Sequence, residues 1–284
     1  MWTRAGTLAT PRCPCRVFRL FLIPITGVIV SQFNDIAPDH SPWHIALQRF
    51  HSGRYHEAYD AVQSHLATQP ECGRGWELLG QVCHSQKRWG AALEAFEQAT
   101  VRVPLSAEAE CNLADCYRFE GRTGWARGLY HHLIRRVGVE VCTLLNAATG
   151  LDDLTEPRMS IVACQRAIRL DPEFAQSYFD MAYYLRRCGA SVATVEASAR
   201  RAICLAPNDI VYRVGLSTFL HAQDRTDDAA LLLKYLTRHH VQQLKCNCCV
   251  ARLMDVLTAV GDHERDSWCR DQLESIPTND REHS

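Results

Sequence analysis

The stretch Trp76–Pro104 reads WELLGQVCHSQKRWGAALEAFEQATVRVP and contains two amphipathic helical patterns around a short turn near Lys87–Trp89. Pro104 ends the second pattern, because proline cannot continue a helix. A single helical hairpin of this size cannot bury its own apolar faces. The stretch therefore predicts that the chain contains further copies of the hairpin.

Three series of positions repeat every 34 residues, and each series contains one step of 35. Small residues dominate the first two series, which indicates that helices cross closely there. Proline or glycine fills the third series, where each second helix ends. The shared one-residue slip falls between Ala182 and Pro207, and we place it near Gly189–Val195. The series are Ala46, Gly80, Ala114, Ala148, Ala182 and Ser217; Ala58, Ala92, Ala126, Ser160, Thr194 and Ala229; and Pro70, Pro104, Gly138, Pro172 and Pro207.

This pattern resembles the tetratricopeptide repeat family. The family motif is matched by Trp76, Leu79, Gly80, Ala92, Phe96, Ala99 and Pro104, with Cys83 in place of an aromatic residue, and the next copy matches with Leu113, Ala114, Tyr117, Ala126, Tyr130 and Leu133. The resemblance implies an all-α, right-handed superhelical solenoid of antiparallel helix pairs. It places six repeats at 39–72, 73–106, 107–140, 141–174, 175–209 and 210–243.

The chain on either side of residues 38–243 departs from the repeat. Residues 244–284 are predicted to form a degenerate capping hairpin, 247–276, followed by a frayed tail. In the leader 1–37, basic residues precede an apolar run at Leu20–Val30. Residues 16–30 would suit export or membrane anchoring. The alternatives are a disordered leader or a mis-assigned start, with Val30 as the true first residue.

Composition favours a globular binding protein over several other classes. The chain has 284 residues, of which 47% are apolar and 22% charged, with a net charge of −1. Such a balance gives no field that attracts nucleic acid or anionic lipid. The sequence contains no nucleophile elbow, HExxH motif, phosphate-binding loop or dinucleotide fingerprint. We therefore predict a protein that is not an enzyme and needs no cofactor.

The chain contains 14 cysteines. Four of them, Cys83, Cys116, Cys164 and Cys204, fall within the helical repeats, where a thiol acts as a small apolar side chain. We therefore expect reduced cysteines and a cytoplasmic location. A separate group, Cys246, Cys248, Cys249 and Cys269 with His263, offers ligand types that zinc prefers, although not at a zinc-knuckle spacing. Ordinary core and loop cysteines are the simpler interpretation, so no metal site is assigned.

The first helix of each hairpin is expected to line a concave wall, where relatives bind extended peptides. Asn112 and Asn146 lie one repeat apart, and their amides could pair with a peptide backbone. The other predicted contacts are Asp115, Arg118, Asp180, Tyr183 and Arg186. A carboxylate clamp is not expected, because no lysine accompanies the two asparagines.

We therefore predict a scaffold or adaptor for a protein or peptide partner, whose identity and the chain's oligomeric state the sequence does not define. Two alternatives remain. One is a metal- or redox-sensitive regulatory protein that uses the Cys246–Cys249 cluster, and the other is a substrate-recruiting accessory subunit of an enzyme.

Overall fold

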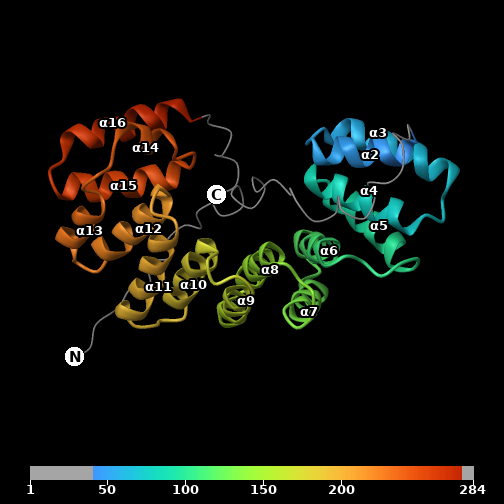
Figure 1. The fold of residues 1–284 in the computed structure, drawn as a ribbon, viewed down its shortest axis with the longest axis horizontal. Helices are drawn as coiled ribbons and strands as arrows, with labels where there is room; N and C mark the ends of the chain where they lie inside the picture. The colour runs from blue at the N-terminus through green and yellow to red at the C-terminus, as the bar shows by residue number, and fades with distance from the viewer. Residues whose placement is uncertain (1–40, 277–284) are drawn as a thin grey trace. The chain divides into compact units, whose positions relative to one another are not determined.

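The computed structural model describes residues 41–276, which form 15 α-helices and no strand (Figure 1). The predicted leader 1–37 and the tail from residue 277 lie outside this range. Residues 41–195 form one compact unit and residues 196–276 form another. We call them the N-terminal unit and the C-terminal unit.

The N-terminal unit contains α2 (Pro42–His51), α3 (Tyr55–Thr68), α4 (Gly73–Ser85), α5 (Trp89–Thr100), α6 (Ala107–Phe119), α7 (Thr123–Leu133), α8 (Val141–Asp153), α9 (Pro157–Leu170) and α10 (Ala175–Arg187). Helix α11 (Val192–Leu205) crosses the division. The C-terminal unit continues with α12 (Ile210–His221), α13 (Thr226–Leu232), α14 (Arg238–Gln242), α15 (Asn247–Ala259) and α16 (His263–Ser275).

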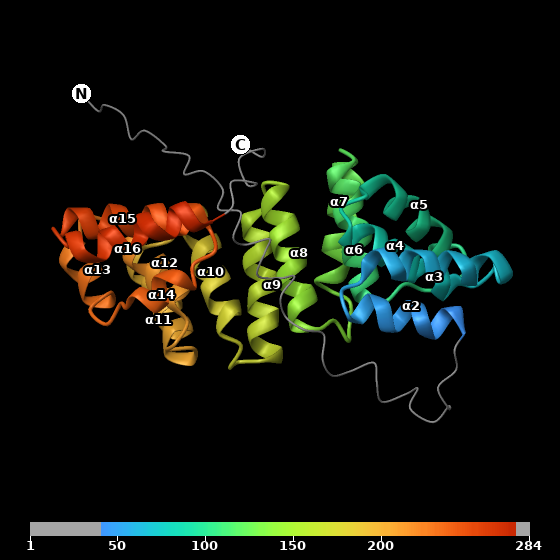
Figure 2. The same cartoon turned by 90° about the horizontal axis from the view of Figure 1, so that it is seen from above.

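The helices pack in consecutive pairs, as the repeat predicts. Extensive contacts join α2 to α3, α4 to α5, α6 to α7 and α8 to α9. Figure 2 shows the two helices of the α8–α9 pair lying side by side. These pairs are the predicted hairpins, and each buries the small residues of the repeat. Ala46, Ala92, Ala114 and Ala148, for example, are fully buried.

Every hairpin turns through a residue in the left-handed backbone region. Glycine supplies it at Gly53, Gly121 and Gly189, and Lys87 and Thr155 supply it in the hairpins between them. These five positions keep the period of 34 residues. A β-branched residue with positive φ is unusual, because its side chain crowds the backbone. Thr155 is therefore a strained position in a turn that glycine would relax.

The one-residue slip lies in the turn before α11. Helix α9 begins at Pro157 and α11 begins at Val192, 35 residues later, whereas Gly189 still keeps the period of 34. The structure corrects one member of the predicted series. Thr194 is exposed, and Val195, 4% exposed, occupies the core position instead. The sequence pattern is compatible with a slip on either side of Thr194, because threonine is small enough to occupy a core position.

Local sequence signals set the ends of several helices. Ser41 accepts a hydrogen bond from the backbone N–H of His44, and Pro42 takes the first helical position of α2. Proline suits this position, since the N–H it lacks would have no partner inside the helix. Pro157 starts α9 in the same way, after the predicted turn at Thr155.

First helices pack on one another from hairpin to hairpin. Contacts join α2 to α4, α4 to α6, α6 to α8 and α8 to α10, whereas no comparably extensive contact joins α3, α5, α7 and α9 to each other. The first helices therefore approach more closely than the second helices do. In a stack of hairpins this places the first helices on the inner side of the curve.

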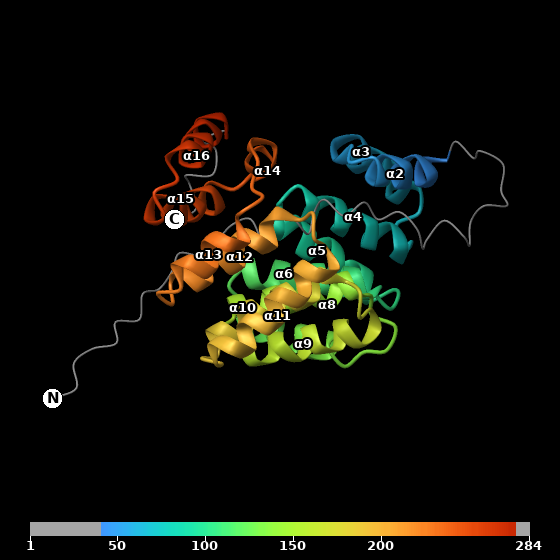
Figure 3. The same cartoon turned by 60° about the vertical axis from the view of Figure 1, so that its left-hand side comes forward.

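The C-terminal unit is less regular. The second helix of the sixth hairpin is interrupted: α13 ends at Leu232, and α14 begins after Thr237. Thr237 and His240 form a reciprocal capping box that starts the new helix. The residues of the predicted capping hairpin form the helix pair α15 and α16 (Figure 3).

Candidate partner-binding surface

The candidate surface belongs to α4, α6, α8 and α10 of the N-terminal unit, which we call the inner helices. At its centre lies Asp115, on α6. The Tyr130 hydroxyl donates to Asp115 Oδ1 over 2.6 Å, and the Arg118 guanidinium donates to the same oxygen over 3.0 Å. His84 Nε2, on α4, lies 3.6 Å from the other carboxylate oxygen. One carboxylate thus connects two hairpins.

Arg118 extends this polar network to the next hairpin. Its guanidinium lies 3.1 Å from Asp153 Oδ2, on α8, and stacks over the Phe119 ring at 4.1 Å. The arginine therefore sits between two carboxylates, Asp115 and Asp153. Its charge is therefore already paired within the chain, without a carboxylate from a partner.

Ionisation in this network follows from its contacts. Burial alone would raise the pKa of the Asp115 carboxyl, but the neighbouring His84 imidazole and Arg118 guanidinium outweigh it, so the pKa lies below its ordinary value. Burial and then the negative charge of Asp115 raise the pKa of the Tyr130 phenol well above its ordinary value. The tyrosine is therefore a fixed hydrogen-bond donor.

Asn112 and Asn146 lie on α6 and α8 at equivalent positions, and both are partly buried. The Asn146 Oδ1 atom is buried and has no hydrogen-bond partner among the described residues. Burying an amide oxygen without a donor is costly. Because this oxygen is covered by the chain itself, a partner would meet the partly exposed remainder of Asn146 rather than its Oδ1 atom.

The predicted contacts on α10 differ in accessibility. Asp180 is only 4% exposed and accepts a hydrogen bond of 2.8 Å from Gln176. Tyr183 and Arg186 are partly exposed, and the Arg186 guanidinium lies over the Tyr183 ring at 5.5 Å. Asp180 therefore holds a neighbouring side chain, while Tyr183 and Arg186 present a cation and an aromatic ring together.

The sequence prediction missed Glu108, at the start of α6. No ion pair joins its carboxylate to another described residue. Burial and then the charge of Glu140 raise the pKa of Glu108. Glu108 did not stand out in the sequence, because acidic residues are common in the first turn of a helix, where they interact favourably with the helix dipole. Helix α6 thus carries Asn112 and, in its first turn, a carboxylate that has no ion-pair partner among the described residues.

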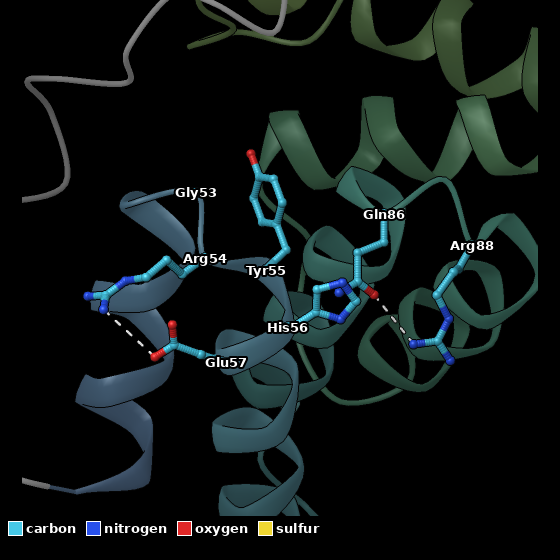
Figure 4. A pocket seen from close by; sticks show the side chains of 7 residues that line it. All are labelled: Gly53, Arg54, Tyr55, His56, Glu57, Gln86 and Arg88. Atoms are coloured by element: carbon cyan, nitrogen blue, oxygen red, sulfur yellow. Dashed lines mark hydrogen bonds and ion pairs between the residues drawn. The ribbon is translucent and has the colours of Figure 1, made fainter. Parts of the chain in front are cut away.

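A shallow cavity of about 530 Å³ lies at the turns of the first two hairpins. Figure 4 shows Arg54 directed toward Glu57 and Arg88 directed toward Gln86. Both arginines are thus engaged by neighbours in the lining. The cavity is lined by Gly53, Arg54, Tyr55, His56, Glu57, Gln86 and Arg88.

The predicted cysteine group is divided by the structure. The Sγ atoms of Cys246, Cys248 and Cys249 lie within 4.8 Å of one another, and this group includes neither Cys269 nor His263. The Cys246 and Cys248 sulfurs are close enough to each other to form a disulfide.

The cysteines of the repeats mostly follow the prediction: Cys83, Cys116 and Cys164 are buried, whereas Cys204 is exposed. No helix within residues 41–276 is long and apolar enough to cross a membrane.

The sequence matches no known family model, and no curated protein sequence matches it. Solved structures do match. A tetratricopeptide repeat protein from Parabacteroides merdae aligns with a TM-score of 0.63 and 14% identity, over 85% of this chain and 95% of that one. PilF of Pseudomonas aeruginosa aligns with a TM-score of 0.56 and 14% identity, over 73% and 93%.

A third structure, YrrB, is described as a tetratricopeptide repeat protein with an unusual peptide-binding site. It aligns with a TM-score of 0.50 and 13% identity, over 73% of this chain and 99% of YrrB. At such identities the likeness concerns architecture rather than function. The chain therefore has the tetratricopeptide-repeat fold.

Proposed function

We propose that the chain is a non-enzymatic scaffold or adaptor that binds an extended peptide, or a helix of a partner protein, along the inner helices. The fold generally serves protein binding, and YrrB is described as having a peptide-binding site. The fold alone does not assign a task. The proposal therefore rests on the side chains of the inner helices.

The observation that carries the proposal is the pair of amides Asn112 and Asn146. They recur at one position of successive inner helices, and both residues are only partly buried. Successive first helices contact one another, so the two amides belong to adjoining elements. An extended peptide offers a backbone N–H and C=O to each amide in turn.

The other residues have supporting roles in this proposal. Asp115 and Arg118 are already ordered by their mutual hydrogen bond, so a partner that touches them loses little side-chain entropy. Tyr183 and Arg186 supply a stacked cation and ring at the α10 end. Asp180 acts through Gln176, since its own carboxylate is buried.

The proposal can be tested by selecting peptides from a displayed random library on the whole chain and measuring their Kd. We expect the double variant Asn112→Ala, Asn146→Ala to weaken binding about tenfold, the loss of roughly two hydrogen bonds. Asn208→Ala, an exposed amide outside the inner helices, is the matched control and should leave Kd unchanged. Selected peptides that bind the double variant as tightly as the wild type would overturn the proposal.

A further inference from the structure

Three cysteines at the start of α15 form a compact sulfur group, which we call the cysteine cluster: Cys246, Cys248 and Cys249. It belongs to the C-terminal unit and takes no part in the inner helices. The three Sγ atoms lie within 4.8 Å of one another. Three thiolates that share one ion at a metal–sulfur distance of about 2.3 Å lie roughly 4 Å apart. Once the Cys246–Cys248 pair is reduced and its two sulfurs separate, the three neighbouring thiolates are close enough to reach that spacing.

The position of the cluster on its helix suits negatively charged sulfur. Cys246 is the N-cap of α15, and its side chain makes no capping hydrogen bond. Cys248 and Cys249 lie within the first turn of this 13-residue helix. The backbone N–H groups of a first turn lack helical partners and carry partial positive charge. Thiolates beside them are stabilised.

A second observation at the same place is the state of Asn247, which lies between the cysteines. Its Oδ1 atom is buried and has no hydrogen-bond partner among the described residues. An orphaned buried acceptor is a common sign of a water or ion that belongs to a site. The Asn247 acceptor next to the cysteine cluster therefore lacks a donor among the described residues.

The composition of the cluster selects the kind of ion. A structural zinc site is closed by four ligands, and the described group supplies three. Cys269 is fully buried on α16 and His263 starts that helix, and neither joins the group. Three soft sulfur ligands without nitrogen or oxygen favour a soft ion. We propose that the reduced cysteine cluster is a three-thiolate site for a thiophilic ion, with Cu(I) as the best match.

The disulfide between Cys246 and Cys248 gives this site an oxidised, closed form. Reduction by a dithiol transfers two electrons and two protons to the protein, giving two thiols, while the dithiol becomes a disulfide. Each thiol that then binds the ion releases its proton to solvent. Oxidation removes two of the three ligands, so the oxidised chain should not bind the ion.

The test uses the whole chain, reduced and then freed of reductant without oxygen, and titrated with Cu(I) against a chromophoric Cu(I) chelator. We expect one Cu(I) per chain to be held at the cluster. Cys248→Ser and Cys249→Ser should each weaken that binding at least tenfold. Cys204→Ser, an exposed cysteine on α11, is the matched control and should not change it. Circular dichroism of each variant confirms that the fold is kept.

A parallel titration with Zn(II) and a sample oxidised to the disulfide complete the experiment. Cu(I) uptake that is equal in the wild type and Cys248→Ser would overturn the site. Tighter binding of Zn(II) than of Cu(I) at the cluster would overturn the assigned ion class. Equal uptake by the oxidised chain would overturn the closed form. None of these results bears on peptide binding by the inner helices.

Discussion

Phe96 and Tyr130 occupy the same position in successive hairpins, 34 residues apart, and both rings are fully buried. Phe96 packs on Gly80 within its own hairpin, where an added Cβ would lie 2.6 Å from the ring. Tyr130 instead faces Gly150 of the following hairpin, and its hydroxyl reaches Asp115. The contact made by Phe96, which we call the apolar joint, and the contact made by Tyr130, which we call the polar joint, thus differ by one hydroxyl group.

The difference shows how a repeat acquires individuality without losing its architecture. The apolar joint only has to fill space, and any chain with the repeat motif would have it. The polar joint must satisfy every buried group, because an unpaired one is costly in an interior. It therefore restricts how neighbouring hairpins can pack against each other. The predictions below test this contrast, beginning with the largest expected effect.

Replacing Asp115 with alanine should destabilise the chain by about 3 kcal/mol, because it leaves the Tyr130 hydroxyl buried without its acceptor and removes one of the two carboxylates beside Arg118. The measurement is urea unfolding followed by circular dichroism. Asp60→Ala, an exposed carboxylate, should change stability by less than about 0.5 kcal/mol.

The Asp115 effect should also depend on pH. The folded-state pKa of Asp115 is lowered from an ordinary value of 3.8, so its contribution is fully present above that pH and is lost as pH falls through the lowered pKa. The wild type should therefore remain more stable to unfolding than Asp115→Ala until the pH is strongly acidic. An advantage that already disappears between pH 6 and about 5 would contradict this assignment.

Gly150→Ala should destabilise the chain by about 2 kcal/mol, since the added methyl group collides with the ring and hydroxyl of Tyr130. Gly124→Ala is the matched control, because nothing lies within 4 Å of a Cβ there. It should stabilise by about 0.5–1 kcal/mol through helix propensity alone. The same denaturation series measures both, and equal signs would refute the close contact.

Tyr130→Phe converts the polar joint toward the apolar one. We expect the free energy of unfolding to fall by about 1 kcal/mol. This is less than a full buried hydrogen bond to a carboxylate, because Asp115 keeps its other hydrogen bonds. Tyr235→Phe, at a 72% exposed ring, should be neutral. If Tyr130→Phe is also neutral, the hydroxyl does not support the network and the contrast between the two joints fails.

A comparably small effect is expected at the turns, where neighbouring hairpins use different residues at the positive-φ position. Thr155→Gly should stabilise by about 1 kcal/mol, because the residue has a φ of 64°. Gly121→Thr, at the equivalent turn of the preceding hairpin, should destabilise by a similar amount. Thermal melting of both variants tests whether the strain is real, and opposite signs are required.

The sequence was sufficient for the architecture because packing constraints recur along the chain. Gly53, Gly121 and Gly189 mark the turns, and the small residues mark helix crossings, so each copy confirms the others. Thr194 was misplaced because the slip has no such marker: a small polar side chain fits the pattern whether it faces the core or solvent.

The candidate site was less predictable, because it depends on contacts between helices, both within one hairpin and between hairpins. Asp115 was expected to face a partner, yet it is held by Tyr130, 15 residues later, and by His84, 31 residues earlier. Helical spacing cannot reveal such pairings, which depend on how hairpins stack. Cys269 was grouped with the other cysteines by ligand type alone, and the structure places it outside the cluster.

The extra residue in the turn before α11 shows where a repeat chain of this kind can accept an insertion. Helices α10 and α11 keep 13 and 14 residues, like α8 and α9 before them, although the turn between them is one residue longer. Added length at Ala190–Ser191 is thus absorbed outside the helices on either side. An epitope tag or a fluorescent label can therefore be inserted in the turn at Ala190–Ser191 while the flanking helices keep their register.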